Sequence, residues 1–142
     1  MITGINHITI AVSNLDTSFE FYVELLGMKP HARWNSGAYL SLGGVWFCLS
    51  CDNAKPSQDY THLALDVTQQ GYETVKTKLL EAGIKAWKDN KSEGDSFYFS
   101  DPDGHKLELH VGDLQSRLAH IKSAAYDGLE LFNSHESNAN KG

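Results

Sequence analysis

Two segments of the chain alternate apolar and polar residues in the manner of half-buried β-strands. Residues 5–12 read Ile-Asn-His-Ile-Thr-Ile-Ala-Val, and residues 60–67 repeat this pattern as Tyr-Thr-His-Leu-Ala-Leu-Asp-Val. His7 therefore corresponds to His62 in an internal repeat. Each strand is followed by a helix-like stretch and then by a glycine suited to a helix C-terminus. These are Leu15–Leu26 with Gly27, and Gln69–Ala82 with Gly83.

Three short β-type segments follow the helix in each copy. They cover Pro30–Trp34, Ala38–Leu42 and Val45–Ser50 in the first copy, and Ala86–Lys88, Ser96–Ser100 and Lys106–Val111 in the second. The expected fold class is α+β, with two paired βαβββ modules. We expect the first module in residues 1–52, a linker in 53–59, and the second module in 60–132. The second module would include a C-terminal helical segment, Leu114–Tyr126, and a flexible tail would follow in 133–142.

Composition excludes several classes of function. Twelve Lys and Arg against eighteen Asp and Glu give a formal net charge of −6, so neither a nucleic acid nor a membrane is expected as a partner. The sequence has no apolar run of the roughly 20 residues that a membrane span needs and no signal peptide, which predicts a cytoplasmic protein. Cys48 and Cys51 are expected to be reduced, with Cys48 as a small core residue.

Strand alternation places possible metal ligands on one face of the fold. In residues 5–12 the branched apolar residues share one face, which leaves His7 and Thr9 on the other, and the repeat places His62 there as well. The leucines on either side of Glu108 should face the helices, so the carboxylate should face the two histidines. Two imidazoles and a carboxylate are a common catalytic metal site, open here to Mn, Fe, Zn or Ni. Histidines that are merely packed or hydrogen-bonded are the alternative.

The segment 88–98 is too polar and too rich in turn-forming residues for a plain hairpin. It could bind an anion or a cation, and an ordinary solvated loop is the alternative. Its donors for a phosphate-like group are Lys88, Ser92, Ser96 and Tyr98. The Asp-Pro-Asp-Gly that follows, residues 101–104, lacks the remaining ligands of an EF-hand and therefore predicts a β-turn.

The motifs around these residues resemble those of a known family. They are residues 6–9 (Asn-His-Ile-Thr), 60–62 (Tyr-Thr-His), the long polar block 87–99, and 101–112 with Glu108 at its centre. Together they are similar to the fosfomycin-resistance glutathione transferases of the vicinal oxygen chelate (glyoxalase/bleomycin-resistance) superfamily. The resemblance extends from Met1 to about Phe132.

The resemblance implies a cupped mixed sheet, the vicinal oxygen chelate fold, and a set of binding sites. Manganese would be held by His7, His62 and Glu108, and potassium by Asn90, Ser92, Gly94 and Ser96. The phosphonate clamp would consist of Thr9, Lys88, Ser92, Tyr98 and Arg117, with Trp46, Tyr39 and Tyr60 as pocket walls. The thiol channel would include Trp34, Ser36, Ser50 and Lys91. A domain-swapped homodimer is also implied, in which His7 of one chain completes the site of the other.

The implied reaction adds the thiol of glutathione to the epoxide carbon of fosfomycin and opens the ring. A metal that touches the epoxide oxygen would stabilise the alkoxide more than the ground state. The catalytic residues would be Thr9, Tyr39, Lys88 and Arg117, with Tyr39 as the candidate for taking the thiol proton.

Other functions of the same fold stay open. Another thiol, bacillithiol or cysteine, would need only a different channel. Water as the nucleophile is expected to need an additional carboxylate as base, and residues 38–50 contain no Asp or Glu. A metal-free drug-binding module would lack the triad of His7, His62 and Glu108, and a glyoxalase I would need a fourth ligand at Cys48.

Overall fold

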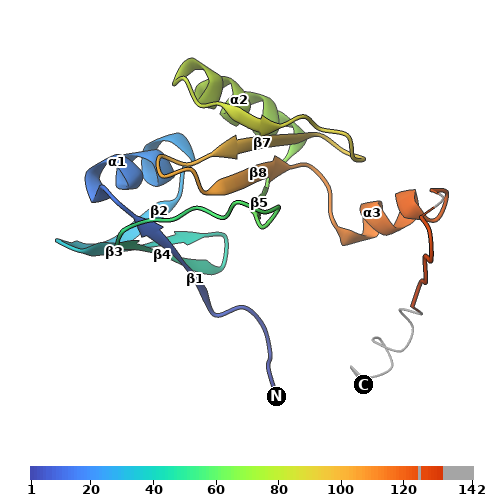
Figure 1. Cartoon of the computed structure of the whole chain (residues 1–142), viewed down its shortest axis with the longest axis horizontal. Coiled ribbons are helices and arrows are strands. Elements are labelled where there is room, and N and C mark those ends of the chain that lie inside the picture. The colour runs from blue at the N-terminus through green and yellow to red at the C-terminus, as the bar shows by residue number, and fades with distance from the viewer. Residues whose placement is uncertain (125, 133–142) are drawn as a thin grey trace. The chain divides into compact units, whose positions relative to one another are not determined.

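The structure is a computed structural model that describes residues 1–124 and 126–132. These residues form two four-stranded sheets (Figure 1). The first has the order β1-β4-β3-β2, and its strands are β1 (His7–Val12), β2 (Lys29–Trp34), β3 (Gly37–Leu42) and β4 (Val45–Cys51). The second has the order β5-β8-β7-β6, and its strands are β5 (Leu63–Asp66), β6 (Ala86–Lys88), β7 (Ser96–Ser100) and β8 (Lys106–His110).

Both sheets have the same topology, which confirms the α+β fold class and the internal repeat. In each sheet the first strand runs parallel to the fourth, and the other neighbours are antiparallel. The first strand also lies at the edge of its sheet, because β1 and β5 each have a single neighbour in the strand order. The two strands that carry or follow the repeated histidines are therefore both edge strands.

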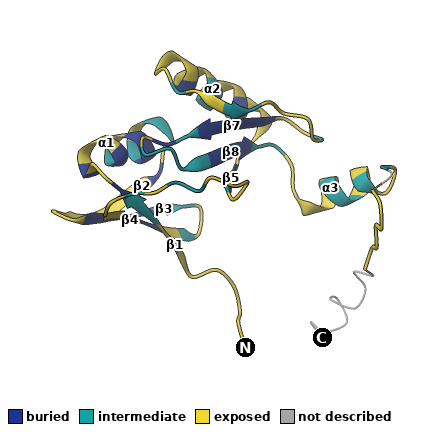
Figure 2. Ribbon diagram, viewed as in Figure 1, coloured by how far each residue is buried: buried dark blue, intermediate teal, exposed yellow. Residues whose placement is uncertain are grey.

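A helix follows the first strand of each sheet and covers its apolar face. The side chain of Asn14 caps α1 (Leu15–Glu20), and that of Thr68 caps α2 (Gln69–Glu81). As the sequence predicted, Gly27 and Gly83 terminate the two helical stretches, each with a φ of +79° that glycine adopts at little cost. Figure 1 shows α2 lying over β7 and β8. Figure 2 shows buried residues gathered on these strands and on the inner sides of both helices.

The first helix differs from the sequence prediction. One regular helix was expected over Leu15–Leu26, but after Glu20 the chain widens into a π-helical turn, η1 (Phe21–Leu25). The amide of Leu26 bonds to the carbonyl of Phe21, five residues back, at 3.1 Å. The adjacent aromatic residues Phe21 and Tyr22 are both buried here. The wider turn thus lets two neighbouring rings enter the core, a detail that apolar periodicity does not predict.

The second repeat strand begins later than expected. A strand was predicted over residues 60–67, but the ladder with β8 starts only at Leu63, opposite Leu107. The preceding backbone is held by a side chain instead, because Lys106 donates to the carbonyls of Ser57 and Asp59. His62 therefore lies in a loop just before the edge strand. The first strand likewise starts at His7 rather than at residue 5, opposite Trp46 of β4.

The C-terminal segment forms a compact unit of its own. The first unit spans Met1–Gly112 and contains both sheets, and the second begins at Asp113. A capping box of Asp113 and Ser116 starts α3 (Leu114–Ile121), which ends earlier than the predicted helical segment to Tyr126. The tail predicted in 133–142 lies outside the described residues. No helix in the described part of the chain is long and apolar enough to cross a membrane.

A hydrogen-bond network joins the first module to the turn between β7 and β8. The buried Tyr22 hydroxyl donates to Asp101 Oδ2 at 2.7 Å, and Asp101 Oδ1 accepts from the amides of Asp103 and His105 at 2.9 and 2.8 Å. His105 Nε2 donates to the carbonyl of Ala11 at 2.7 Å, and Ser13 donates to the Asp103 carboxylate. The predicted β-turn at 101–104 is confirmed, since Gly104 N donates to Asp101 O at 3.0 Å.

The pKa of Asp101 is raised above its ordinary value by burial, and the hydrogen bond from Tyr22 opposes this shift. The folded state thus holds a proton on Asp101 more tightly than the unfolded state does. The stability that Asp101 contributes is present below the ordinary pKa of 3.8 and is lost as the pH rises through the raised value. The hydrogen bond from the Tyr22 hydroxyl to Asp101 therefore contributes most to the stability of the fold at neutral pH.

We expect Tyr22→Phe to lower the free energy of unfolding by about 1–3 kcal/mol at neutral pH, because it leaves a buried carboxylate oxygen without its donor. The loss should shrink as the pH falls through the pKa of Asp101. Chemical denaturation at neutral pH and at the lowest pH that leaves the wild type folded would measure both values. Tyr72→Phe is the control, since Tyr72 is also buried but its hydroxyl donates no hydrogen bond within the described residues. Equal losses in both variants at both pH values would contradict the assignment.

Candidate active site

The carboxylate of Glu108 lies buried on the face of β8 opposite the core. Leu107 and Leu109 are buried on the helix side, as the alternation predicted, and Glu108 is 6% exposed. A buried carboxylate needs partners, because leaving water without them costs several kcal/mol. Two imidazoles supply them: His62 Nε2 lies 3.0 Å from Glu108 Oε1, and His110 Nδ1 lies 3.3 Å from Oε2.

The orientation of His62 suits a metal ligand. Its Nδ1 lies 2.8 Å from the carbonyl oxygen of Tyr60, which can only accept, so Nδ1 carries the hydrogen. Nε2 then directs a lone pair at Glu108 Oε1, which is itself an acceptor. Two acceptors 3.0 Å apart require a cation between them, either a proton on His62 or a metal ion. A backbone carbonyl on the far nitrogen is the usual support of a metal-binding histidine, so these residues fit a divalent cation.

His7 lies apart from this pair. It is exposed on the edge strand β1, with its ring 4.4 Å from that of Trp46 and its Nδ1 2.8 Å from Asn6 Oδ1. In the part of one chain that the structure describes, no three His, Cys, Asp or Glu side chains gather as a metal-binding group. The expectation from strand alternation that His7 meets His62 is therefore not met within a single chain. In one chain the candidate ligands thus form two separate groups, His7 alone and His62 with Glu108.

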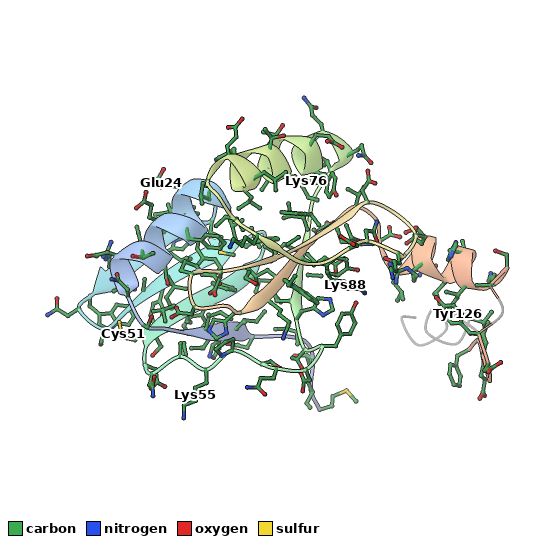
Figure 3. The ribbon with its side chains drawn as sticks, turned by 45° about the horizontal axis from the view of Figure 1, so that its top comes forward. Glu24, Cys51, Lys55, Lys76, Lys88 and Tyr126 are labelled. Atoms are coloured by element: carbon green, nitrogen blue, oxygen red, sulfur yellow. The ribbon has the colours of Figure 1, made fainter. Side chains whose placement is uncertain are left out.

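An aromatic and basic cluster surrounds the His62 half of the site. The Tyr60 ring lies 4.7 Å from His62 and the Tyr98 ring 6.0 Å away. Lys88 Nζ donates to the Tyr60 hydroxyl at 2.6 Å and lies over both tyrosine rings, at 4.5 and 4.7 Å from their centroids. Figure 3 shows Lys88 beside the second sheet. The hydrogen bond to Tyr60 raises the pKa of Lys88, so the ammonium stays charged at neutral pH.

Asp59 orders the loop that leads to Tyr60 and His62. Its carboxylate accepts from the Ser57 hydroxyl and from the amide of Thr61. These bonds, led by the one from Ser57, lower the pKa of Asp59 to about 2. The turn therefore keeps its charged acceptor at neutral pH and holds His62 just before the start of β5.

The polar loop 90–96 closes on itself next to Glu108. Asn90 donates to the carbonyl of Gly94 at 2.9 Å and accepts from the Ser92 amide and hydroxyl at 3.0 and 3.1 Å. Gly94 has a φ of +76°, and an added Cβ would lie 2.5 Å from the carbonyl oxygen of Val111, so only glycine fits this turn. The buried hydroxyl of Ser96 lies 2.6 Å from His110 Nδ1. The four residues expected to hold a monovalent cation thus share one tight turn, and Lys91 is exposed beside them.

The first module presents a row of aromatic rings on the exposed side of its sheet. Tyr39 lies between Trp34, at 4.8 Å, and Trp46, at 5.1 Å, all partly exposed. Ser36 and Ser50 are exposed near the Trp34 end, where Ser50 pairs with Gly37 at the start of β3. The predicted wall residues Tyr39 and Trp46 and the predicted channel residues Trp34, Ser36 and Ser50 are therefore neighbours in the first module. Tyr60 and Lys91, predicted for the same two sets, lie in the second module.

Thr9 is exposed on β1 and pairs with Cys48 of β4, as Ala64 of β5 pairs with Glu108. Cys48 thus occupies the position in the first module that Glu108 occupies in the second. It is buried and free, as predicted, and Cys51 is free and exposed. Arg117 lies on α3 in the C-terminal unit, separate from the unit that holds these residues.

Two residues near the site were missed by the sequence analysis. Trp87 donates from its indole to the carbonyl of Leu107 at 3.1 Å and packs 5.6 Å from the His62 ring. His110 contacts both Glu108 and Ser96. A signal for His110 was present, because it follows Glu108 by two positions and must point to the same face of the strand.

Comparison with known proteins identifies the family of this chain. The family model described as Glyoxalase/Bleomycin resistance protein/Dioxygenase superfamily matches residues 4–109. The chain is 52% identical over 142 residues to the glutathione transferase FosA of Serratia marcescens, covering 96% of this chain and 100% of the relative. It is 40% identical over 135 residues to the metallothiol transferase FosB of Staphylococcus epidermidis, covering 87% and 94%.

A solved structure shares the fold. It is a mutant of the fosfomycin resistance protein FosX from Listeria monocytogenes, complexed with Mn(II) and 1S,2S-dihydroxypropylphosphonic acid. The two chains are 26% identical with a TM-score of 0.78, over 85% of this chain and 99% of the other. On these matches, and on the doubled βαβββ topology, the chain belongs to the Glyoxalase/Bleomycin resistance protein/Dioxygenase superfamily.

Proposed function

We propose that the protein is a metal-dependent transferase that adds the thiol of glutathione to an epoxide carbon of fosfomycin. The observation that carries the proposal is the 3.0 Å contact between His62 Nε2 and Oε1 of the buried Glu108, an arrangement that suits two metal ligands, in a chain 52% identical to a glutathione transferase. The product would be a ring-opened adduct without the epoxide, so the antibiotic would be inactivated.

Manganese is the metal we propose, with His62, Glu108 and a His7 as ligands. When bound, it would supply a Lewis acid for the negative charge that develops on the epoxide oxygen. The protein's part is to hold the ligands: the carbonyl of Tyr60 fixes the tautomer of His62, and β8 fixes Glu108 between two buried leucines. The presence of Mn(II) in the FosX structure supports this choice of metal.

We assign the phosphonate group of the substrate to the basic and aromatic cluster. Lys88 keeps its charge, and it lies within reach of the Tyr60 and Tyr98 rings next to His62. The Tyr60 hydroxyl accepts from Lys88 in this bond, so its own hydrogen would be available to a phosphonate oxygen beside the ammonium. Thr9, Ser92 and Arg117 complete the proposed clamp. Binding energy from this group would hold the epoxide carbon in line with the attacking sulfur.

We place the thiol over the aromatic row of the first module, with Tyr39 as the group that takes the thiol proton. The channel residues would be Trp34, Ser36, Ser50 and Lys91. Glutathione is the proposed thiol because identity with the FosA relative exceeds identity with the FosB relative, 52% against 40%. The rates of fosfomycin turnover with glutathione and with cysteine at equal concentration would show which of the two thiols the protein prefers. A cytoplasmic location is proposed as well, since glutathione is kept reduced there.

The site would be assembled from two chains. His7 is exposed on edge strand β1, and the His62 half lies at edge strand β5. A swapped homodimer would bring β1 of one chain to β5 of the other, which covers both edges and completes the ligand set.

Glu108→Gln is expected to weaken Mn²⁺ binding by more than the roughly 10–100-fold typical of losing an outer-sphere partner, because it removes a charged ligand. Turnover of fosfomycin with glutathione should fall with it, and removal of metal by a chelator should abolish wild-type activity until Mn²⁺ is restored. Glu73→Gln, an exposed carboxylate on α2, is the matched control. Normal turnover by metal-free Glu108→Gln would refute the metal site.

We further propose that the loop of Asn90, Ser92, Gly94 and Ser96 binds potassium. Activity at sub-saturating fosfomycin should be clearly higher in K⁺ than in Na⁺ of equal concentration, since a K⁺ ion beside the clamp adds positive charge for the phosphonate. Asn90→Ala should reduce this difference, and Asn53→Ala in the linker should not. Identical wild-type rates in both buffers would return the loop to a plain turn.

The swapped assembly can be tested by mixing two inactive variants. In His7→Ala and Glu108→Ala homodimers every site should lack a ligand, whereas a swapped heterodimer of the two has one doubly damaged and one intact site. Random exchange should then restore about a quarter of wild-type activity, because half of the dimers carry one working site out of two. No recovery in mixtures shown to contain heterodimers would mean that each chain builds its own site.

A further inference from the structure

His110 connects the candidate metal carboxylate to the polar loop. Its Nδ1 lies 2.6 Å from Ser96 Oγ and 3.3 Å from Glu108 Oε2. Ser96 and His110 are register partners on β7 and β8, and Glu108 is two residues earlier on the same face. A single ring nitrogen thus faces both the loop and the carboxylate.

The loop also packs directly on the His110 ring. A Cβ added to Gly94 would lie 3.4 Å from His110 Cε1 and 3.7 Å from Nε2, so the glycine backbone rests against the imidazole. On the same side, His110 Nε2 lies 4.0 Å from Glu93 Oε1. Ser96 is buried and His110 is half-buried, so a change in the position of the Ser96 hydroxyl would be passed to the ring through their hydrogen bond.

The chemistry at Nδ1 makes this contact directional. A carboxylate oxygen can only accept, so the contact of 3.3 Å with Glu108 Oε2 is attractive when Nδ1 carries the hydrogen. The same N–H faces Ser96 Oγ, whose free lone pair then takes part of it. A cation in the loop that attracted the Ser96 oxygen would weaken the hydrogen bond from His110 Nδ1 to Ser96. The hydrogen bond from the same N–H to Glu108 would then become stronger. The Oε1 atom, on the far side of the carboxylate, remains directed at His62.

We propose that His110 is a positioning residue which couples cation binding in the 90–96 loop to the metal affinity of Glu108. This inference rests on the proposed function, since it takes the loop as a monovalent cation site and Glu108 as a metal ligand. Binding of K⁺ orients Ser96, Ser96 orients His110, and His110 sets the Glu108 carboxylate for the divalent ion. Because coupling between two binding sites is reciprocal, Mn²⁺ tightens K⁺ binding by the same factor.

The test measures Mn²⁺ affinity of the full-length protein without substrate, from the electron paramagnetic resonance signal of free Mn²⁺. Each titration is run in K⁺ and in tetramethylammonium at equal ionic strength, the latter being too large for the loop. For the wild type we expect K⁺ to tighten Mn²⁺ binding by roughly 5-fold or more. Fluorescence or calorimetric titration of K⁺ with and without Mn²⁺ should give the same ratio.

Two substitutions of similar chemistry isolate His110 Nδ1. His110→Asn places its amide group where Nδ1 lies and should keep most of the K⁺ effect, whereas His110→Gln carries the amide about one bond length beyond it and should lose the effect. Mn²⁺ binding by His110→Gln in K⁺ should also weaken by about 10–100-fold. The control is His31→Gln, because His31 on the exposed strand β2 makes a comparable bond, to Ser41 Oγ of β3 at 2.7 Å, that involves no carboxylate.

The outcomes separate this inference from the proposed function. Equal Mn²⁺ affinity of the wild type in both buffers, with binding that depends on Glu108, would overturn the coupling and leave the metal site intact. A K⁺ effect that persists undiminished in His110→Gln would overturn the role of His110. If Mn²⁺ binding were unchanged by Glu108→Gln, the proposed metal site itself would fail and the coupling with it. Loss in His110→Gln with retention in His110→Asn and His31→Gln would support the inference.

Discussion

The site depends on the cost of burying one carboxylate. Glu108 is held away from water because its neighbours Leu107 and Leu109 are anchored in the core, and the strand allows no other direction for its side chain. That cost has to be offset by hydrogen-bond donors or by a cation. The imidazoles of His62 and His110 contact the two carboxylate oxygens, and each imidazole is in turn held by a neighbouring loop. The charged Lys88 lies nearby.

Strand β8, which carries Glu108, is also held in place at its N-terminal end. The turn that precedes β8 contains Asp101, Asp103 and His105, which bond to η1 and to the end of β1. β1 carries His7 and β8 carries Glu108, so the two strands that present the proposed ligands are tied at one end by polar contacts, of which the His105 bond to Ala11 is partly buried. The polar network thus relates the two modules in a way that apolar packing, which tolerates small slips, would not specify alone.

Sequence reasoning succeeded where the signal was local. The direction of Glu108, the repeated topology and both helix-ending glycines follow from alternation and from a doubled pattern. The π-helical turn that begins at Phe21 was not predicted, and the predicted start of the second repeat strand was too early. Both features depend on contacts with residues distant in the sequence, such as those of Lys106 with the carbonyls of residues 57 and 59. The separation of His7 from His62 in one chain is likewise a tertiary property. The alternation of side chains along the strand could have identified His110, two positions after Glu108, but it was not predicted as a site residue.

The two modules share one topology but differ in the residue at the position of Glu108. This difference would determine the net charge of the proposed metal site. The position equivalent to Glu108 in the first module is filled by Cys48, a free cysteine that is buried and pairs with Thr9. With two acidic residues, a divalent ion in this place would be neutralised. With one, it would keep a single positive charge. A single acid at these two equivalent positions would therefore leave the proposed centre attractive to an anionic ligand, in a chain that is acidic as a whole.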